Sequence, residues 1–333
     1  ITKGKNMNNI KKIGLTALAG SLVAITAQAA EMTVSGATML TYTSEDGTET
    51  TGNPLGMKTN IGFTASGEVN GYNVSYMQTS KDQFAGMSSA RLSVDMGDMG
   101  TFAYDQGSGS GLATIDDKTP TAAEEIWDGL DSTTAGRVGT AGSTGVVNYI
   151  NTFQGVTLNA AVRKGSGTAN ADGASSGVGQ GAWDFALTAD GSSMGVDGLA
   201  IGLGYGEEQN GSQTNSTDND GEQMTAFANY SAGPVTFGYQ MSYIDHGLIN
   251  TDNEKTDAWG LAFNVNENLS ISYGERDVVY EGGTDVTEKF DGIAVAYTMG
   301  SMKIAGNMND VSDSAGVSGT NDSMTEIAVS FAF

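Results

Sequence analysis

The chain has 333 residues, of which 39 are Asp or Glu and 15 are Lys or Arg, and its net charge is −24. A chain this acidic should repel nucleic acid and attract cations, although acidity also keeps ordinary surface loops soluble. The absence of cysteine excludes disulfides and thiolate metal sites. Low hydrophobicity and 48 glycines are found in disordered chains, but 12 tyrosines and 11 phenylalanines in alternating segments favour extended sheet.

Residues 1–29 have the pattern of a secretory signal peptide, with a few residues upstream of the expected start at Met7. Two lysines precede a short apolar run over 13–26, and Ala27-Gln28-Ala29 supplies the small-x-small cleavage pattern. The alternative is a membrane anchor, but the run is shorter than the roughly 20 apolar residues that a spanning helix needs. We expect cleavage after Ala29 and one domain over 30–333.

Sixteen later segments alternate between large apolar and small or polar residues, which is the period-two pattern of strands. In 235–244, for example, the odd positions are Val, Phe, Tyr, Met and Tyr, and the even positions include Thr, Gly, Gln and Ser. The segments are 31–43, 57–67, 71–80, 87–96, 100–106, 144–152, 156–164, 181–189, 199–206, 222–231, 235–244, 257–265, 269–278, 288–298, 301–309 and 323–333.

The connections between these segments alternate in length. Tight turns, such as those at 68–71, 97–100 and 153–155, alternate with mostly long, polar loops, such as 44–56, 165–180 and 207–221. Short turns on one rim and long loops on the other are typical of up-and-down barrels of the outer membrane. A two-sheet sandwich, the alternative, gives no reason for this alternation.

The longest connection, 107–143, needs an explanation because loops of this length are uncommon. Thr121 and Glu124 have capping-box spacing and Gly129 suits a helix end, so we expect one or two helical turns at 121–128. The apolar residues of the loop suit packing against a wall, which would leave its acids facing a pore. These apolar residues are Leu112, Ile115, Ile126, Trp127 and Leu130. The alternative is an external helix that shields the mouth.

The last segment alternates up to an aromatic carboxy-terminus at Phe333. Polar residues share the inward parity in several strands; Arg91 and Arg163 are examples. A closed barrel of about 16 strands is wide enough for an aqueous channel. We therefore predict an all-β fold, a transmembrane antiparallel up-and-down β-barrel of about 16 strands with the long third loop folded into the lumen.

Enzymatic and metal-binding readings have little support. His246, the only histidine, lies beside Asp245 in an expected external loop, but no nucleophile motif accompanies it. The run 218–221 is similar to part of a calcium loop, yet Phe227 stands where a bidentate Glu is required. We predict no catalytic residues, no dedicated metal site and no cofactor.

The chain resembles the general diffusion porins of Gram-negative outer membranes, particularly the acidic sixteen-stranded type of marine proteobacteria. The resemblance rests on the signal peptide, the segments 60–68 and 96–102, the third loop and terminal Phe333, but the Pro-Glu-Phe-Gly-Gly loop signature of enterobacterial members is absent. It implies a homotrimer in outer-membrane lipid and an acidic constriction opposite a basic wall. By position the acids would be Asp116, Asp117, Glu124, Glu125 and Asp128. The basic wall residues would be Lys58, Arg91, Arg137 and Arg163.

Three functions remain open from the sequence. The first is a water-filled channel for passive diffusion of ions and small hydrophilic solutes, with a preference for cations. The second is a substrate-selective channel, and the third is a non-transporting barrel such as an adhesin. For each arginine of the wall, a lumen salt bridge that braces the barrel is an alternative to a role in permeation.

Overall fold

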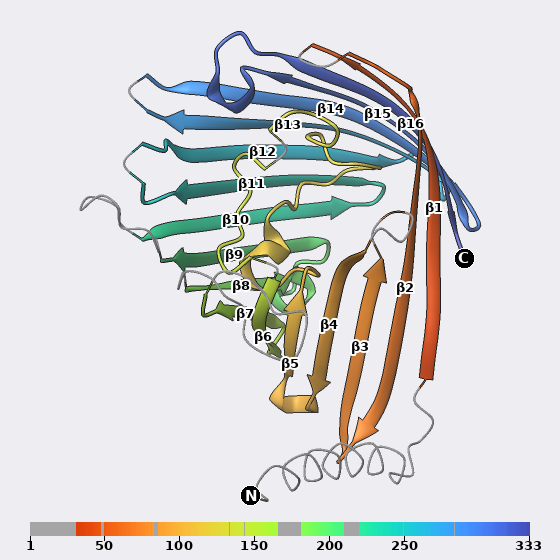
Figure 1. The fold of residues 1–333 in the computed structure, drawn as a ribbon, viewed down its shortest axis with the longest axis vertical. Helices are drawn as coiled ribbons and strands as arrows, with labels where there is room; N and C mark the ends of the chain where they lie inside the picture. Colours follow the sequence, from red (N-terminus) through yellow and green to blue (C-terminus); the bar gives the residue numbers. More distant parts are fainter. Residues whose placement is uncertain are drawn as a thin grey trace, which may run out of the picture.

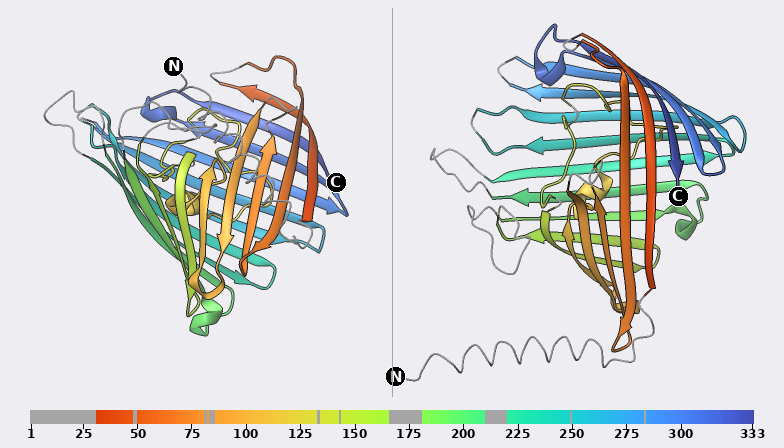
Figure 2. Two further views of the ribbon diagram at one scale, coloured as in Figure 1. Left: turned by 60° about the horizontal axis from the view of Figure 1, so that its bottom comes forward. Right: turned by 45° about the vertical axis from the view of Figure 1, so that its right-hand side comes forward.

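The computed structural model describes residues 31–333 except 48–49, 81, 83–85, 133, 143, 166–180, 210–219, 249 and 283. The expected signal peptide, 1–29, lies outside the described residues. The described chain is a closed barrel of sixteen antiparallel strands, in which neighbours along the chain pair and β1 pairs with β16 (Figures 1 and 2). The predicted barrel is confirmed.

Every expected segment is a strand, and several strands run longer than expected. The first eight are β1 (Glu31–Asp46), β2 (Leu55–Val69), β3 (Tyr72–Ser80), β4 (Met87–Asp95), β5 (Thr101–Gln106), β6 (Thr144–Phe153), β7 (Val156–Arg163) and β8 (Ala182–Asp190). The others are β9 (Leu199–Glu208), β10 (Gly221–Ala232), β11 (Val235–Asp245), β12 (Asn253–Asn264), β13 (Leu269–Glu281), β14 (Val286–Met299), β15 (Met302–Ser312) and β16 (Asp322–Ala332).

Alternation along each strand separates an apolar outer surface from the lumen. In β14, Ile293 is 52% exposed on the outside, whereas Ala294 is 5% exposed on the inside. Successive side chains of a strand point to opposite faces, so period-two hydrophobicity gives the whole barrel an apolar belt. A membrane covers such a belt. In the described part of the chain, no helix is long and apolar enough to cross a membrane.

The tight turns have the backbone that short hairpins need. Asn70 and Gly71 join β2 to β3 with φ of 55° and 85°, and Gln154 and Gly155 join β6 to β7 with φ of 50° and 83°. Two consecutive positive φ angles match the right-handed twist of the flanking strands. Of the long loops at the other rim, 166–180 and 210–219 lie outside the described residues.

The first and last strands close the barrel. The Gly36 N–H donates to the Phe333 carbonyl at 2.8 Å, and the Phe333 N–H donates to the Gly36 carbonyl at 2.9 Å. The Phe333 ring lies over Gly36, where an added Cβ would come within 2.7 Å of it. Closure leaves no strand edge unpaired at this seam, as a hydrocarbon surrounding requires.

Candidate functional site

The third loop, residues 107–143, starts and ends at one buried carboxylate on the inner wall. The Leu112 N–H donates to Asp184 Oδ1 at 3.0 Å, and the Ala141 N–H donates to Asp184 Oδ2 at 2.7 Å. A Cβ on Gly111 would meet Asp184 Oδ1 at 1.7 Å, and the φ of Gly111 is +57°, so only glycine fits there. Asp184 on β8 thus fixes both limbs of the loop at its neck.

From this neck the outgoing limb crosses the inner side of β10 to β16 (Figure 1, yellow). Side chains that point inward from five strands hold it by hydrogen bonds to its backbone. These side chains are Asn229, Gln240, Ser272, Asn309 and Asp322. Asn309 donates to two loop carbonyls, those of Glu125 at 3.1 Å and Asp128 at 2.9 Å.

The returning limb is held by β10, β12 and β13. Gln223 accepts the Gly139 N–H at 2.7 Å, Glu254 accepts the Gly136 N–H, and Arg276 donates to the Ala135 carbonyl. The loop therefore runs along the inner wall and back, and hydrogen bonds hold both limbs to the wall.

Apolar side chains of the loop pack against the wall as the sequence predicts. Leu112 and Ile115 join a cluster with Phe227 of β10, and Leu130 joins a cluster with Phe290 of β14. Ile126 and Trp127 lie against the second cluster and are partly buried. Since burial of such side chains stabilises by about 1.5–3 kcal/mol each, the loop belongs inside the lumen. The alternative of an external helix at the mouth is wrong.

The helix expected at 121–128 is absent. Ala122 donates its N–H to Ser272, Asn309 occupies two carbonyls of this segment, and the Thr121 hydroxyl donates to the Glu124 carbonyl at 2.6 Å. Wall side chains thus satisfy backbone groups that a helix would pair internally. Helical geometry appears instead as a 3-10 turn at Gly111–Ile115.

Four of the five predicted acids gather where the two limbs face each other. Asp116 pairs with Arg137 of the returning limb at 2.6 Å, and Asp117 accepts the Trp127 indole N–H at 2.8 Å. The Arg137 guanidinium lies 4.2 Å from the centre of the Trp127 ring, within the range of a cation–π contact. The ion pair and the aromatic contact cross-link the limbs.

Glu124 and Glu125 complete this acidic group. Burial is the largest of the effects that together raise the pKa of Glu125 to about 8. The carboxylates of Asp117, Asp116 and Glu124 contribute to the same rise, and the Arg137 guanidinium opposes it. Glu125 therefore holds a proton at neutral pH, since ionising it would add a charge to an already negative, poorly hydrated place.

The four basic residues expected on the wall lie apart from one another. Arg91 lies at the root of the loop, where it donates to the Gly109 carbonyl at 3.2 Å and approaches the buried Asp105 at 3.7 Å. Arg163 pairs with Glu208 of β9 at 2.6 Å, and Arg137 belongs to the loop itself. Lys58 is exposed on β2.

The sequence interpretation missed Arg276, which is 3% exposed on β13. Besides its bond to the returning limb, its Nη1 lies 3.9 Å from Asp117 Oδ2 of the outgoing limb, and its guanidinium lies 6.0 Å from the Phe290 ring centre. The alternation along β13 could have identified it, because Arg276 lies on the same inward face as Ser272 and Gly274. The same signal marks Asp184 and Glu254.

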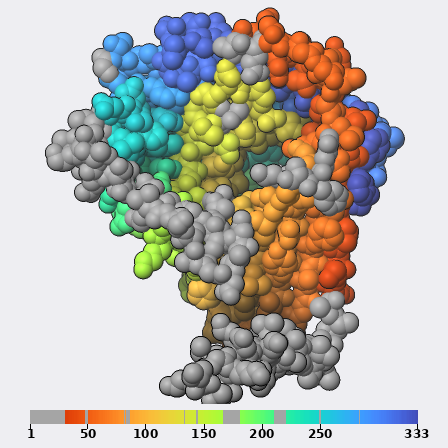
Figure 3. Space-filling view, viewed as in Figure 1, coloured from red at the N-terminus to blue at the C-terminus, as the bar shows by residue number. Residues whose placement is uncertain are grey.

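The open part of the lumen lies along β1 to β3. Strands β10 to β15 alternate between exposed outward and buried inward residues, because the loop covers their inner side. In β2, by contrast, the inward Lys58, Asn60 and Thr64 are all exposed. In Figure 3 the loop (yellow) lies between the cyan and blue strands and the orange strands β1 to β3. The water-accessible passage runs between the loop and this polar wall.

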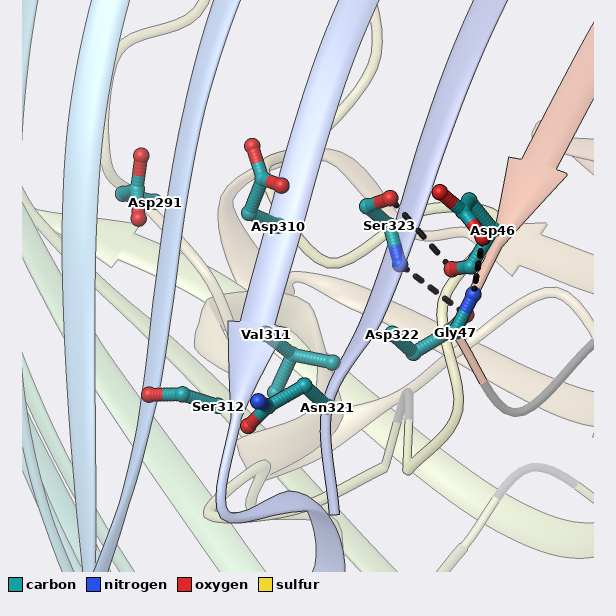
Figure 4. Close-up of a pocket in the computed structure, with 9 residues that line it drawn as sticks. All are labelled: Asp46, Gly47, Asp291, Asp310, Val311, Ser312, Asn321, Asp322 and Ser323. Atoms are coloured by element: carbon teal, nitrogen blue, oxygen red, sulfur yellow. Dashed lines mark hydrogen bonds between the residues drawn. The ribbon is translucent and has the colours of Figure 1, made fainter. Parts of the chain in front are cut away.

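A second acidic group lies on the outer surface near the loop rim. It forms one row across four neighbouring strands (Figure 4). The row consists of Asp291 on β14, Asp310 on β15, Ser323 on β16 and Asp46 on β1. Together they line a depression of about 390 Å³. These residues share the parity of the exposed Ile293, so they point away from the passage.

The remaining candidate chemistry gives no reactive cluster. His246 Nε2 lies 2.9 Å from Glu254 Oε1, and the other oxygen of Glu254 accepts the Gly136 N–H, so His246 takes part in holding the returning limb. Across the described ranges, no group of three or more His, Asp or Glu side chains has the arrangement of a metal site. In the run 218–221, residues 218 and 219 lie outside the described residues.

Comparisons with known proteins agree with this architecture. The chain matches the family model described as Gram-negative porin over residues 14–333. A trimer form of in-vitro folded OmpT from Vibrio cholerae superposes with a TM-score of 0.64 at 15% identity, over 92% of this chain and 100% of that one. An anion-selective porin from Comamonas acidovorans has a TM-score of 0.65 at 12% identity, over 91% and 100%. OmpF of Salmonella typhi in complex with daunomycin has 0.68 at 12%, over 91% and 98%. No curated protein matches the chain.

Proposed function

The chain belongs to the Gram-negative porin family, and we propose that this outer-membrane diffusion channel passes ions and small hydrophilic solutes with a preference for cations. The observation that carries the proposal is the acidic third loop held inside a barrel whose open inner wall is polar. Carboxylates at a narrow neck concentrate cations and repel anions. Outer-membrane lipid surrounds the apolar belt, and the porin is not an enzyme.

The carboxylates that lie near three arginines support the proposed cation preference. Arg91 is near Asp105, Arg137 is paired with Asp116, and Arg163 is paired with Glu208. Each of these positive charges is thus offset locally. Residues rather than the fold must decide selectivity, because a porin of similar fold from Comamonas acidovorans is anion-selective.

Planar bilayers test the proposal directly. The purified protein should give stepwise ohmic conductance, and a KCl gradient should give a zero-current potential of the sign that cation flow produces. A substrate-selective channel would instead show conductance blocked by its solute at low concentration. Silence in a bilayer, with the barrel folded, would favour a non-transporting barrel and contradict the proposal.

Cation preference should increase between about pH 7 and about pH 9. The pKa of Glu125 is about 8, so this carboxyl loses its proton in that range and adds one negative charge to the loop. Zero-current potentials measured across the pH range should follow a single titration. The Glu125→Gln variant should remove this step; a step that persists in the variant would assign it to another group.

We also propose a homotrimer, on the basis of the family and of the trimer form of OmpT. Chemical cross-linking of native membranes should give a ladder that ends at three subunits. In bilayers, conductance should then appear in groups of three equal steps. Monomer alone after cross-linking would contradict the trimer but not the channel.

A further inference from the structure

Glu326 occupies the place where the third loop meets the open wall. It lies on β16 with the inward parity of Met324 and Ala328, and it is half-buried. The Thr43 hydroxyl of β1 donates to Glu326 Oε2 at 2.9 Å, which fixes the carboxylate at the seam between the last and first strands.

The loop contacts β16 at Met324, the next inward-facing residue after Glu326. A Cβ on Gly129 would come within 2.5 Å of the Met324 side chain, and Asn309, which is opposite Met324 in β15, holds the Asp128 carbonyl. Asp322 accepts the Asp131 N–H at 3.0 Å. Inward residues 322 and 324 are therefore covered by the loop, and Glu326 is the first inward position of β16 at the edge of that cover.

Charges from both sides of the passage act on Glu326. They are those of Asp128 and Glu124 on the loop, and that of Lys58 on β2. Neither loop carboxylate takes part in the ion pairs found among the described residues. Lys58 and Glu326 also share the inner surface, since Lys58 lies opposite Met39 and Glu326 lies opposite Thr43 of β1.

We propose that Glu326 is a specificity-determining residue of the pore, which puts negative charge on the wall as well as on the loop. The resemblance to general diffusion porins implies a basic wall opposite an acidic loop. In this chain the inner wall carries the acid Glu326 in addition to the base Lys58. This inference rests on the proposed channel function, but it concerns which residue sets the selectivity.

The test is charge replacement at position 326 in the full-length channel. Glu326→Gln should lower the cation-over-anion permeability ratio in a KCl gradient about two- to threefold, since a unit charge acts over several ångströms in water. Glu275→Gln on β13 is the matched control, because its carboxylate points outward toward Trp259 and Tyr273. This control should leave the ratio unchanged.

Cysteine chemistry gives a second readout that does not depend on the sign of the parent channel's selectivity. The chain has no cysteine, so Glu326→Cys adds a single thiol. An anionic methanethiosulfonate reagent should restore the parent potential, and a cationic reagent should shift it toward anions. Unchanged potentials in Glu326→Gln and in both modified forms would overturn the role of Glu326, even if the parent channel prefers cations. A non-selective parent whose potential still follows the charge at 326 would support Glu326 while contradicting the proposed cation preference.

Discussion

Replacement of Glu124 by Gln and Asp128 by Asn should lower the cation-over-anion permeability ratio roughly fivefold at low salt. Both carboxylates lie on the third loop beside the open passage, and both act on Glu326 across from them. Zero-current potentials in a KCl gradient measure the effect. It should shrink as ionic strength rises, because the Debye length is about 3 Å at 1 M salt and mobile ions then screen the loop.

The matched control for this pair is the double variant Asp291→Asn and Asp310→Asn. These two acids lie on the outer surface of β14 and β15, so their neutralisation removes the same charge without touching the passage (Figure 4). Adding Glu125→Gln to the loop variant should change little at neutral pH, because Glu125 already holds a proton there. Equal shifts from the loop pair and the outer pair would contradict the constriction at the third loop.

Replacement of Arg276 by Met should have the largest effect on the loop itself. Arg276 donates to the Ala135 carbonyl of the returning limb and lies 3.9 Å from Asp117 of the outgoing limb, and it is almost fully buried. Removal of one partner from a buried charged pair costs at most about 3–5 kcal/mol. Here Asp117 keeps its hydrogen bond from Trp127, and the Ala135 carbonyl loses its bond from Arg276. The cost falls on attachment of the loop, since the strand ladder of β13 is unchanged.

We expect Arg276→Met channels to be noisier and of higher conductance, with the barrel still folded. Single-channel recordings report the loop, and the difference in gel mobility between boiled and unboiled samples reports the barrel. Arg276→Lys keeps the charge and should restore part of the low current noise and lower conductance of the parent channel. Lys289→Met, on the outer face of β14, removes a cation outside the lumen and is the control. Quiet channels in Arg276→Met would show that the other bonds of the loop suffice to hold it.

The fold could be predicted from sequence because its signals are local. Alternation in a strand depends only on which residues face lipid and which face the lumen, so each of the sixteen strands can be recognised alone. The sequence also indicates that the third loop packs against the barrel wall. Its large apolar side chains can be buried only against another surface, and examples are Leu112, Ile115 and Leu130. The resemblance to porins assigned the five acids of the loop to a constriction, and that assignment stays a prediction.

Only the tertiary structure decided which partner each polar group has. Parity places Arg91, Arg163 and Arg276 inside the barrel, but the path of the loop, which depends on contacts far apart in sequence, determines what each one meets. The same path prevents the local helix at 121–128, because Ser272 and Asn309 take the backbone groups that a helix needs. It also covers β10 to β15 and leaves β1 to β3 open. The sequence alone therefore determined the barrel and the acidic loop, whereas long-range hydrogen bonds decided where the passage runs and which charges face it.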